Sequence, residues 1–191
     1  MTAALAVAGC GDDERQLAGA VREPALDVAS VTLPAAADGR EVPMRAEESG
    51  LLVVYFGYTS CPDICPTTLS DLSIAVGDLP AELADRVQVA FVTVDPERDT
   101  PEVVQGYLGS FFPDGIALHT EDEDALAAAA AAFGVQYEVA DHAPGDEDYD
   151  VAHTAVTYVV DDTGHVVVEW PFGMAPDDMA ADLSTLLEKE T

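Results

Sequence analysis

Positively charged residues are scarce in this chain of 191 residues. Seven Lys and Arg residues stand against 37 Asp and Glu residues, which gives a formal net charge of −30, and the only lysine is Lys189. A surface of this charge repels nucleic acid and anionic lipid headgroups, which argues against both as partners. An acidic excess of this size resembles the proteins of salt-adapted organisms, and an acidic exported protein is the alternative.

Long apolar segments and cysteines are also few. No run of 18 or more apolar residues occurs, so the sequence predicts no membrane-spanning helix. The three cysteines are Cys10, Cys61 and Cys65. Hydrophobic residues nevertheless make up 49% of the chain, which excludes intrinsic disorder. The length suits one well-buried domain.

Cys10 ends the short segment Leu5-Ala6-Val7-Ala8-Gly9-Cys10. The segment resembles a lipoprotein signal, in which the cysteine is lipidated and becomes the mature N-terminus. Acyl chains contribute about 0.8 kcal/mol per buried CH₂, so more than one chain anchors a protein stably. The alternative is an unstructured N-terminus with a stray cysteine. We expect residues 1–24 to be this signal-like segment and a tether, and residues 25–191 to form the domain.

Cys61 and Cys65 lie four residues apart, directly after the apolar run Leu51–Phe56. Such a run predicts a buried strand, and Pro62 and Pro66 suit the first turn of a following helix. If the helix has begun by Cys61, the two thiols lie on one face, with their Cα atoms roughly 6 Å apart. That spacing allows a disulfide or a shared metal ion. The chemistry of the chain is predicted to lie here.

The remaining elements are predicted from periodicity and from turn and capping residues. After the first strand and a helix to about Leu79, they are a strand at Val87–Val94, a helix capped by Thr100, a short strand at Ile116–Leu118, a helix over Asp122–Phe133, a strand at Val135–Ala140, the paired strands Thr154–Val160 and His165–Trp170, and a last helix from Pro176. A hairpin around Asp38-Gly39 precedes them, and Asp141–Asp150 is an acidic loop. This order predicts an α/β, thioredoxin-like fold: a central mixed sheet flanked by helices, with an added N-terminal hairpin.

Three blocks of sequence carry a resemblance to a known family. They are Phe56–Pro66, Val94–Pro101 and His153–Asp161. Together they resemble the Sco/SenC family of copper chaperones for cytochrome c oxidase assembly, over most of the chain from about Val28 to Leu187. The first two blocks are specific in combination, and the third matters mainly for its histidine.

The resemblance implies a copper site formed by Cys61, Cys65 and His153. Soft thiolates favour Cu(I), and two sulfurs with one imidazole make a three-coordinate site that Zn²⁺ would find incomplete. The expected cofactor is therefore copper, as Cu(I) or Cu(II). Binding needs reduced thiols, so a disulfide would exclude the metal. Thioredoxin-like oxidoreductases carry a cis-proline facing their cysteines, and the segment His153-Thr154-Ala155 has none, which favours metal ligation.

Other polar residues are weaker candidates. His142, in the acidic loop, is a rival or auxiliary ligand. Asp95 lies either near the copper or at the cap of the next helix. Arg98 is expected to pair with Asp95 or Asp99 and is assigned no chemical role, and His165 is expected to be structural.

The function implied by the resemblance is that of a binding protein and not of an enzyme. It is a copper chaperone that delivers copper to the two-copper site of cytochrome c oxidase subunit II. The protein would be held at the extracytoplasmic face of the cell membrane by a lipid on Cys10. The alternative is a thiol–disulfide oxidoreductase that keeps the acceptor cysteines reduced, with Cys61 and Cys65 as its redox pair. A peroxidase of the same broad fold would need one lone cysteine of low pKa, and the pair argues against it.

Overall fold

A five-stranded sheet forms the centre of the computed structural model, which describes residues 16–189. The strands lie in the order β5-β4-β3-β8-β9, with β3, β4 and β5 parallel and β8 and β9 antiparallel to their neighbours. Their bounds are Leu51–Gly57 (β3), Val87–Thr93 (β4), Ile116–Leu118 (β5), Val156–Val160 (β8) and Val166–Pro171 (β9). The mixed sheet and its helices confirm the predicted thioredoxin-like class.

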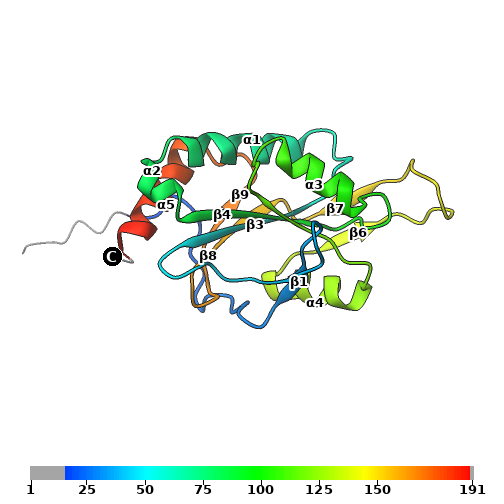
Figure 1. The fold of residues 1–191 in the computed structure, drawn as a ribbon, viewed down its shortest axis with the longest axis horizontal. Coiled ribbons are helices and arrows are strands. Elements are labelled where there is room, and N and C mark those ends of the chain that lie inside the picture. The colour runs from blue at the N-terminus through cyan, green and yellow to red at the C-terminus, as the bar shows by residue number, and fades with distance from the viewer. Residues whose placement is uncertain (1–15, 190–191) are drawn as a thin grey trace, which may run out of the picture.

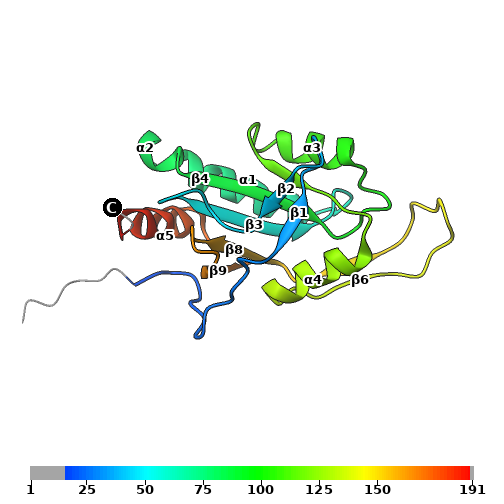
Figure 2. The same cartoon turned by 60° about the horizontal axis from the view of Figure 1, so that its bottom comes forward.

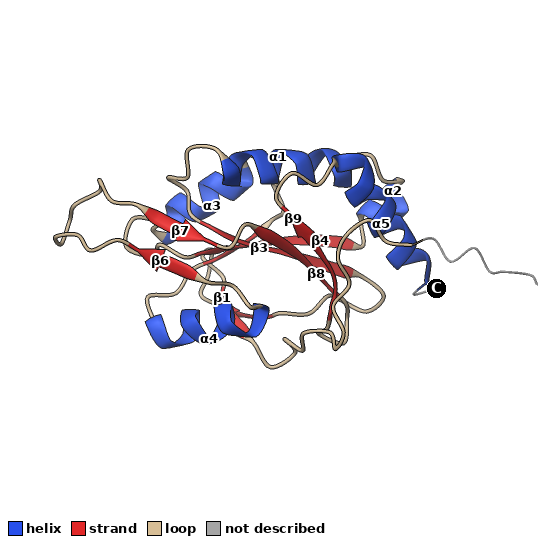
Figure 3. Ribbon diagram, turned by 180° about the vertical axis from the view of Figure 1, so that it is seen from behind, coloured by secondary structure: helices blue, strands red, loops and turns tan. Residues whose placement is uncertain are grey.

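Helices cover both faces of this sheet (Figures 1 and 3). α1, α2, α3 and α5 lie on one face, and α4 lies on the other beside the hairpin of β1 and β2. The bounds are Ile64–Gly77 (α1), Ala81–Ala84 (α2), Pro101–Gly109 (α3), Glu123–Phe133 (α4), Pro176–Lys189 (α5), Thr32–Pro34 (β1) and Glu41–Pro43 (β2). The hairpin turns at Gly39 with φ +72°, which confirms the Asp-Gly turn.

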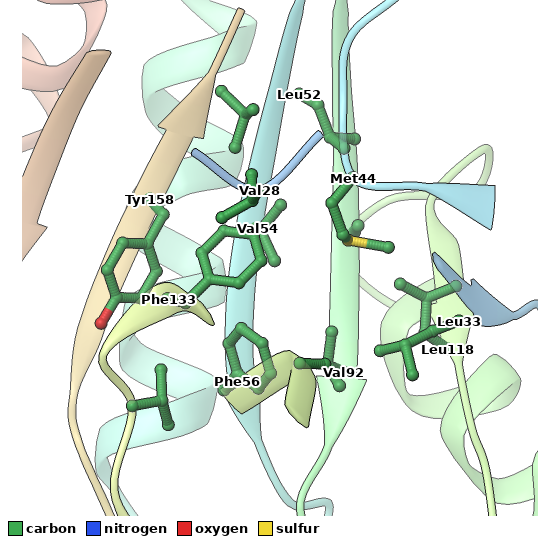
Figure 4. Packing of buried hydrophobic residues seen from close by; sticks show 14 of the residues in the cluster. Val28, Leu33, Met44, Leu52, Val54, Phe56, Val92, Leu118, Phe133 and Tyr158 are labelled. Carbon is green, nitrogen blue, oxygen red and sulfur yellow. The ribbon is translucent and has the colours of Figure 1, made fainter. Parts of the chain in front are cut away.

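The central strand β3 explains why its sequence is continuously apolar. All seven of its residues are buried, because both faces of the sheet are covered. Alternate residues point to opposite faces. Leu52, Val54 and Phe56 join the core cluster that contains α4 and the hairpin. Figure 4 shows Val54 and Phe56 beside Phe133 of α4.

Most of the predicted helix signals are confirmed, and the first helix starts later than the condition placed on the cysteine spacing. Thr100 caps α3 by accepting a hydrogen bond from the Val103 N–H, and Gly134 ends α4 with φ +70°. However, α1 begins at Ile64 and not by Cys61. Asp63 forms no side-chain cap; instead the Cys65 N–H donates to Cys61 Sγ at 3.3 Å. The cysteine sulfur therefore takes the acceptor position that a capping side chain normally fills.

A two-stranded ribbon outside the main sheet was not predicted as a unit. β6 (Tyr137–Val139) pairs antiparallel with β7 (Val151–His153), and His153 lies opposite Tyr137. Figures 1 and 2 show the ribbon and its connecting loop extending from one end of the molecule. The ribbon thus places His153 at its base, where the chain returns to the sheet.

The N-terminal segment is bound to the domain from Leu17 onward, although the sequence predicted a tether as far as Pro24. Leu17 contacts the core, and the N–H groups of Ala18 and Gly19 donate to the buried Asp182 carboxylate at 2.7 and 2.9 Å. Cys10 lies outside the described residues. Among the described residues, no helix is both long enough and apolar enough to cross a membrane.

Candidate metal centre

Cys61, Cys65 and His153 come together at the carboxyl end of β3. Their two sulfurs and one imidazole nitrogen all lie within 4.8 Å of one another, and Cys65 Sγ is 3.5 Å from His153 Nε2. Both cysteines are free thiols. In the part of the chain that the structure describes, this is the one group of three or more His, Cys, Asp or Glu residues close enough to share a metal ion. The structure therefore brings together the three predicted residues.

Cys65 is fixed by the core. Its side chain is fully buried among Tyr55, Phe91 and neighbouring residues, and the Tyr55 hydroxyl donates to Cys65 Sγ at 3.7 Å. Gly57 leaves the space that this sulfur occupies, because a Cβ at this position would lie 3.0 Å from Cys65 Sγ and 3.0 Å from the Phe91 ring. The absence of a Cβ at Gly57 therefore gives the thiol room that a larger residue would make tight.

The two thiols differ in acidity. Burial raises the pKa of Cys65 to about 12. Burial also acts to raise the pKa of Cys61, but hydrogen bonds from the Cys65 N–H and other donors outweigh it, so that the pKa of Cys61 is lowered. Cys61 is partly exposed. The free site therefore holds one thiol that ionises more readily than an ordinary cysteine and one that gives up its proton only to a strong competitor such as a cation.

His153 is oriented as a metal ligand would be. Its Nδ1 lies 3.1 Å from the Thr154 carbonyl oxygen, which can only accept, so Nδ1 carries the proton. Nε2 is left with its lone pair, facing Cys65 Sγ. The ring lies edge-on to both Tyr55 and Tyr58, and burial lowers the pKa of His153, which keeps the imidazole neutral at pH 7. A neutral, oriented imidazole and two sulfurs fit a soft cation.

The weaker candidates lie outside this group. His142 is engaged elsewhere, with Nδ1 on the Ala140 carbonyl at 2.8 Å and Nε2 on Glu97 at 2.9 Å. Asp95 is buried, pairs with Arg98 and accepts the Tyr149 hydroxyl at 2.7 Å. His165 contacts Thr163 Oγ1 at 2.8 Å, in the turn before β9, and lies outside this group.

Several residues around the site were missed by the sequence reasoning. Gly57 and Tyr58 lie within the cysteine motif block Phe56–Pro66, and Tyr55 directly precedes it. Tyr55 alternates with Phe56 and so faces α1, which is a signal that strand periodicity could have provided. A glycine at the end of a strand marks close approach of another group, and Gly57 meets that description. The role of Tyr58 depends on His153, which is remote in sequence and carried no local signal.

The fold and the site together define a thioredoxin-like domain with a cysteine pair and a histidine suited to a soft metal. The chain belongs to the SCO1/SenC family, whose family model matches residues 35–188. Among curated proteins, a SCO2-like protein from Rickettsia prowazekii is 40% identical over 114 residues, which cover 60% of this chain and 55% of that protein. The matched region thus spans little more than half the length of that relative.

Solved structures show the same fold. Apo Sco1 from Thermus thermophilus is 36% identical with a TM-score of 0.78, and the match covers 90% of this chain and 97% of that one. ScoI from Bradyrhizobium japonicum, determined with copper bound, is 33% identical with a TM-score of 0.68, and the match covers 81% of this chain and 95% of that one. This chain is therefore similar both to metal-free and to copper-bound members of the family.

Proposed function

We propose that this protein is a copper chaperone that uses Cys61, Cys65 and His153 to carry copper to the two-copper site of cytochrome c oxidase subunit II. The observation that supports this most is the position of the three ligand atoms, all within 4.8 Å of one another. The ligand set favours Cu(I), because two thiolates and one imidazole satisfy its low coordination number.

The relatives support copper as the cargo and oxidase assembly as the process. The similar ScoI of Bradyrhizobium japonicum binds copper, and the Sco family is one of cytochrome c oxidase assembly proteins. Within this chain, the partly exposed Cys61 is the ligand that an acceptor thiolate can reach first, whereas Cys65 lies in the core. Delivery would then proceed by successive exchange of thiolate ligands, starting at Cys61.

Attachment to a membrane is a further part of the proposal. A lipid on Cys10 would hold the domain of residues 25–191 at the extracytoplasmic face of the cell membrane. The support is the Leu5–Cys10 segment, which resembles a lipoprotein signal. Mass spectrometry of the membrane-extracted protein would test it, since a lipidated Cys10 must be the first residue and carry the mass of its acyl chains.

A second candidate function is favoured by the unequal thiols. A lowered pKa at Cys61 beside a buried Cys65 suits a thiol–disulfide oxidoreductase, in which the more acidic and more exposed cysteine attacks first. Such an enzyme would keep the acceptor cysteines reduced. It requires the cysteine pair but not the imidazole of His153.

The experiment that separates the two functions is an anaerobic Cu(I) titration of the reduced protein and of His153→Ala. If the protein is a copper chaperone, the Cu(I) affinity of the variant should fall by more than the ~10–100-fold that removal of an outer-shell partner costs. Its Cys61–Cys65 disulfide should still form. His165→Ala is the matched control, because this histidine lies outside the site. An unchanged affinity in His153→Ala would show that the imidazole is not a copper ligand. The redox function would then be favoured.

A further inference from the structure

Arg98 is positioned between the two halves of the metal centre. We propose that it is a positioning residue, which holds the ribbon that carries His153 against the segment that carries Cys61. This inference rests on the proposed ligand set. The sequence had assigned Arg98 no chemical role, and its contacts in the structure supply one.

The guanidinium is anchored on a buried carboxylate. Arg98 forms an ion pair with Asp95, and their side chains are 10% and 1% exposed, respectively. Burial of a charge is costly unless it is paired and fully bonded. Arg98 is also one of only seven positive residues in a chain of net charge −30. An exposed position would cost less, so the buried position requires an explanation in what Arg98 contacts.

Arg98 binds the stretch that leads into β7. Its Nη1 donates to the backbone carbonyls of Glu147 at 3.1 Å and Tyr149 at 2.9 Å. Its Cζ lies 3.7 Å from the centre of the Tyr149 ring, and the opposite side of that ring stacks on His142 at 3.7 Å. The Tyr149 hydroxyl reaches back to Asp95. Since only three residues separate Tyr149 from His153, this contact fixes the chain immediately before the imidazole.

The same segment also binds the cysteine side of the site. Asp99, next to Arg98 in the chain, accepts the Thr59 N–H at 2.9 Å. The Arg98 guanidinium lies 5.7 Å from the centre of the Tyr58 ring, which in turn meets the His153 ring edge-on at 5.9 Å. The Cys61 N–H donates to the Tyr58 carbonyl. Adjacent residues therefore hold the two halves: Asp99 holds the cysteine loop, and Arg98 holds the ribbon.

This arrangement requires the planar fork of an arginine. A guanidinium can form one ion pair, donate to two carbonyl oxygens and stack on an aromatic ring at the same time. It also remains charged at every accessible pH. A lysine ammonium keeps the charge but cannot reproduce these directions. Arg98→Lys therefore keeps the positive charge and removes the contacts that position the ribbon.

The test compares the wild-type protein with Arg98→Lys, using Arg22→Gln as control, because Arg22 forms an exposed pair with Glu169 on β9. In the reduced, metal-free protein we expect Arg98→Lys to speed amide hydrogen exchange in β6 and β7 at least tenfold, with exchange in β3 and β4 unchanged. Its Cu(I) affinity should fall by ~10–100-fold, as for other residues that orient a ligand, and formation of the Cys61–Cys65 disulfide should be unaffected. Arg22→Gln should change none of these.

Unchanged exchange in the ribbon, or a loosened ribbon with wild-type copper affinity, would overturn the proposal. If Arg98→Lys does not fold, Tyr149→Phe provides the test, because it removes only the hydroxyl that reaches Asp95 and should give the same changes to a smaller extent. Failure of the proposed function would look different. In that case the wild-type protein itself would not need His153 for copper binding, whatever the behaviour of Arg98→Lys.

Discussion

The two halves of the metal centre are built in different ways. Cys65 lies in the first turn of α1, inside the core, and its sulfur occupies space left by Gly57. His153 ends β7, which belongs to a ribbon of two short strands outside the main sheet. An isolated two-stranded ribbon is marginally stable, whereas a buried side chain on the central strand and helix moves only with the core. The thiol half is therefore rigid by packing, and the imidazole half depends on a few polar contacts.

The strongest test of this comparison removes one sulfur at a time. Cys61→Ser and Cys65→Ser should each abolish tight Cu(I) binding, because each leaves a single thiolate. A chelator competition under anaerobic conditions measures the loss, which should exceed that of Arg98→Lys. Tight binding retained by both single variants would contradict a site with two sulfur ligands.

A smaller effect is expected from filling the space beside the buried sulfur. Gly57→Ala places a Cβ 3.0 Å from Cys65 Sγ and 3.1 Å from the Tyr55 ring, so the core must shift. We expect the free energy of unfolding to fall by ~1–3 kcal/mol, the usual cost of overpacking, and Cu(I) affinity to fall with it.

Gly77→Ala is the matched control for that substitution. It lies at the end of α1 with open space around its Cβ position, so the same change should be neutral or raise stability by roughly 0.5–1 kcal/mol. Denaturant unfolding of both variants measures the difference. Equal stabilities would show that Gly57 does not make room for the thiol.

The last and smallest effect is a difference in reactivity between the two thiols of the wild-type protein. The pKa of Cys61 is lowered and that of Cys65 is raised to about 12, so at pH 8 the thiolate population is concentrated on Cys61. Iodoacetamide should modify Cys61 at least ~10-fold faster, since each pKa unit changes the thiolate fraction about tenfold. Mass spectrometry at pH 7, 8 and 9 measures the ratio. The two cysteines reacting at equal rates would contradict the unequal environments.

The sequence was most informative for the thiol half, because short-range patterns determine it. The apolar run at Leu51–Phe56 predicted a central strand, and the cysteine spacing predicted neighbouring sulfurs. The helix starts at Ile64, after Cys61, so the one-face argument for a helix begun by Cys61 does not apply; Cys61 Sγ instead accepts the Cys65 N–H. The sulfurs meet nevertheless, because this hydrogen bond folds the loop that carries Cys61 over the start of the helix.

The imidazole half depended on resemblance alone, for a physical reason. The predicted strand at Val135–Ala140 contains β6, but β7 has only three residues, too few to show a period, and a long acidic loop separates the two strands. Contacts between Arg98 and residues 147–149 join segments remote in sequence, and no local pattern marks them. Asp182 was missed in the same way. A carboxylate on an amphipathic helix is expected at the surface, yet it is buried by the N-terminal segment and the Trp170 indole.

That carboxylate has a consequence for how the domain faces its surroundings. Asp182 fixes Ala18 and Gly19 beside α5, so the first described residues leave the domain at the end away from the β6–β7 ribbon (Figure 2). Any anchor upstream therefore pulls on the back of the molecule. The partly exposed Cys61 follows the carboxyl end of β3, so attachment through the N-terminal segment would leave this thiol open to a partner that approaches from the other side.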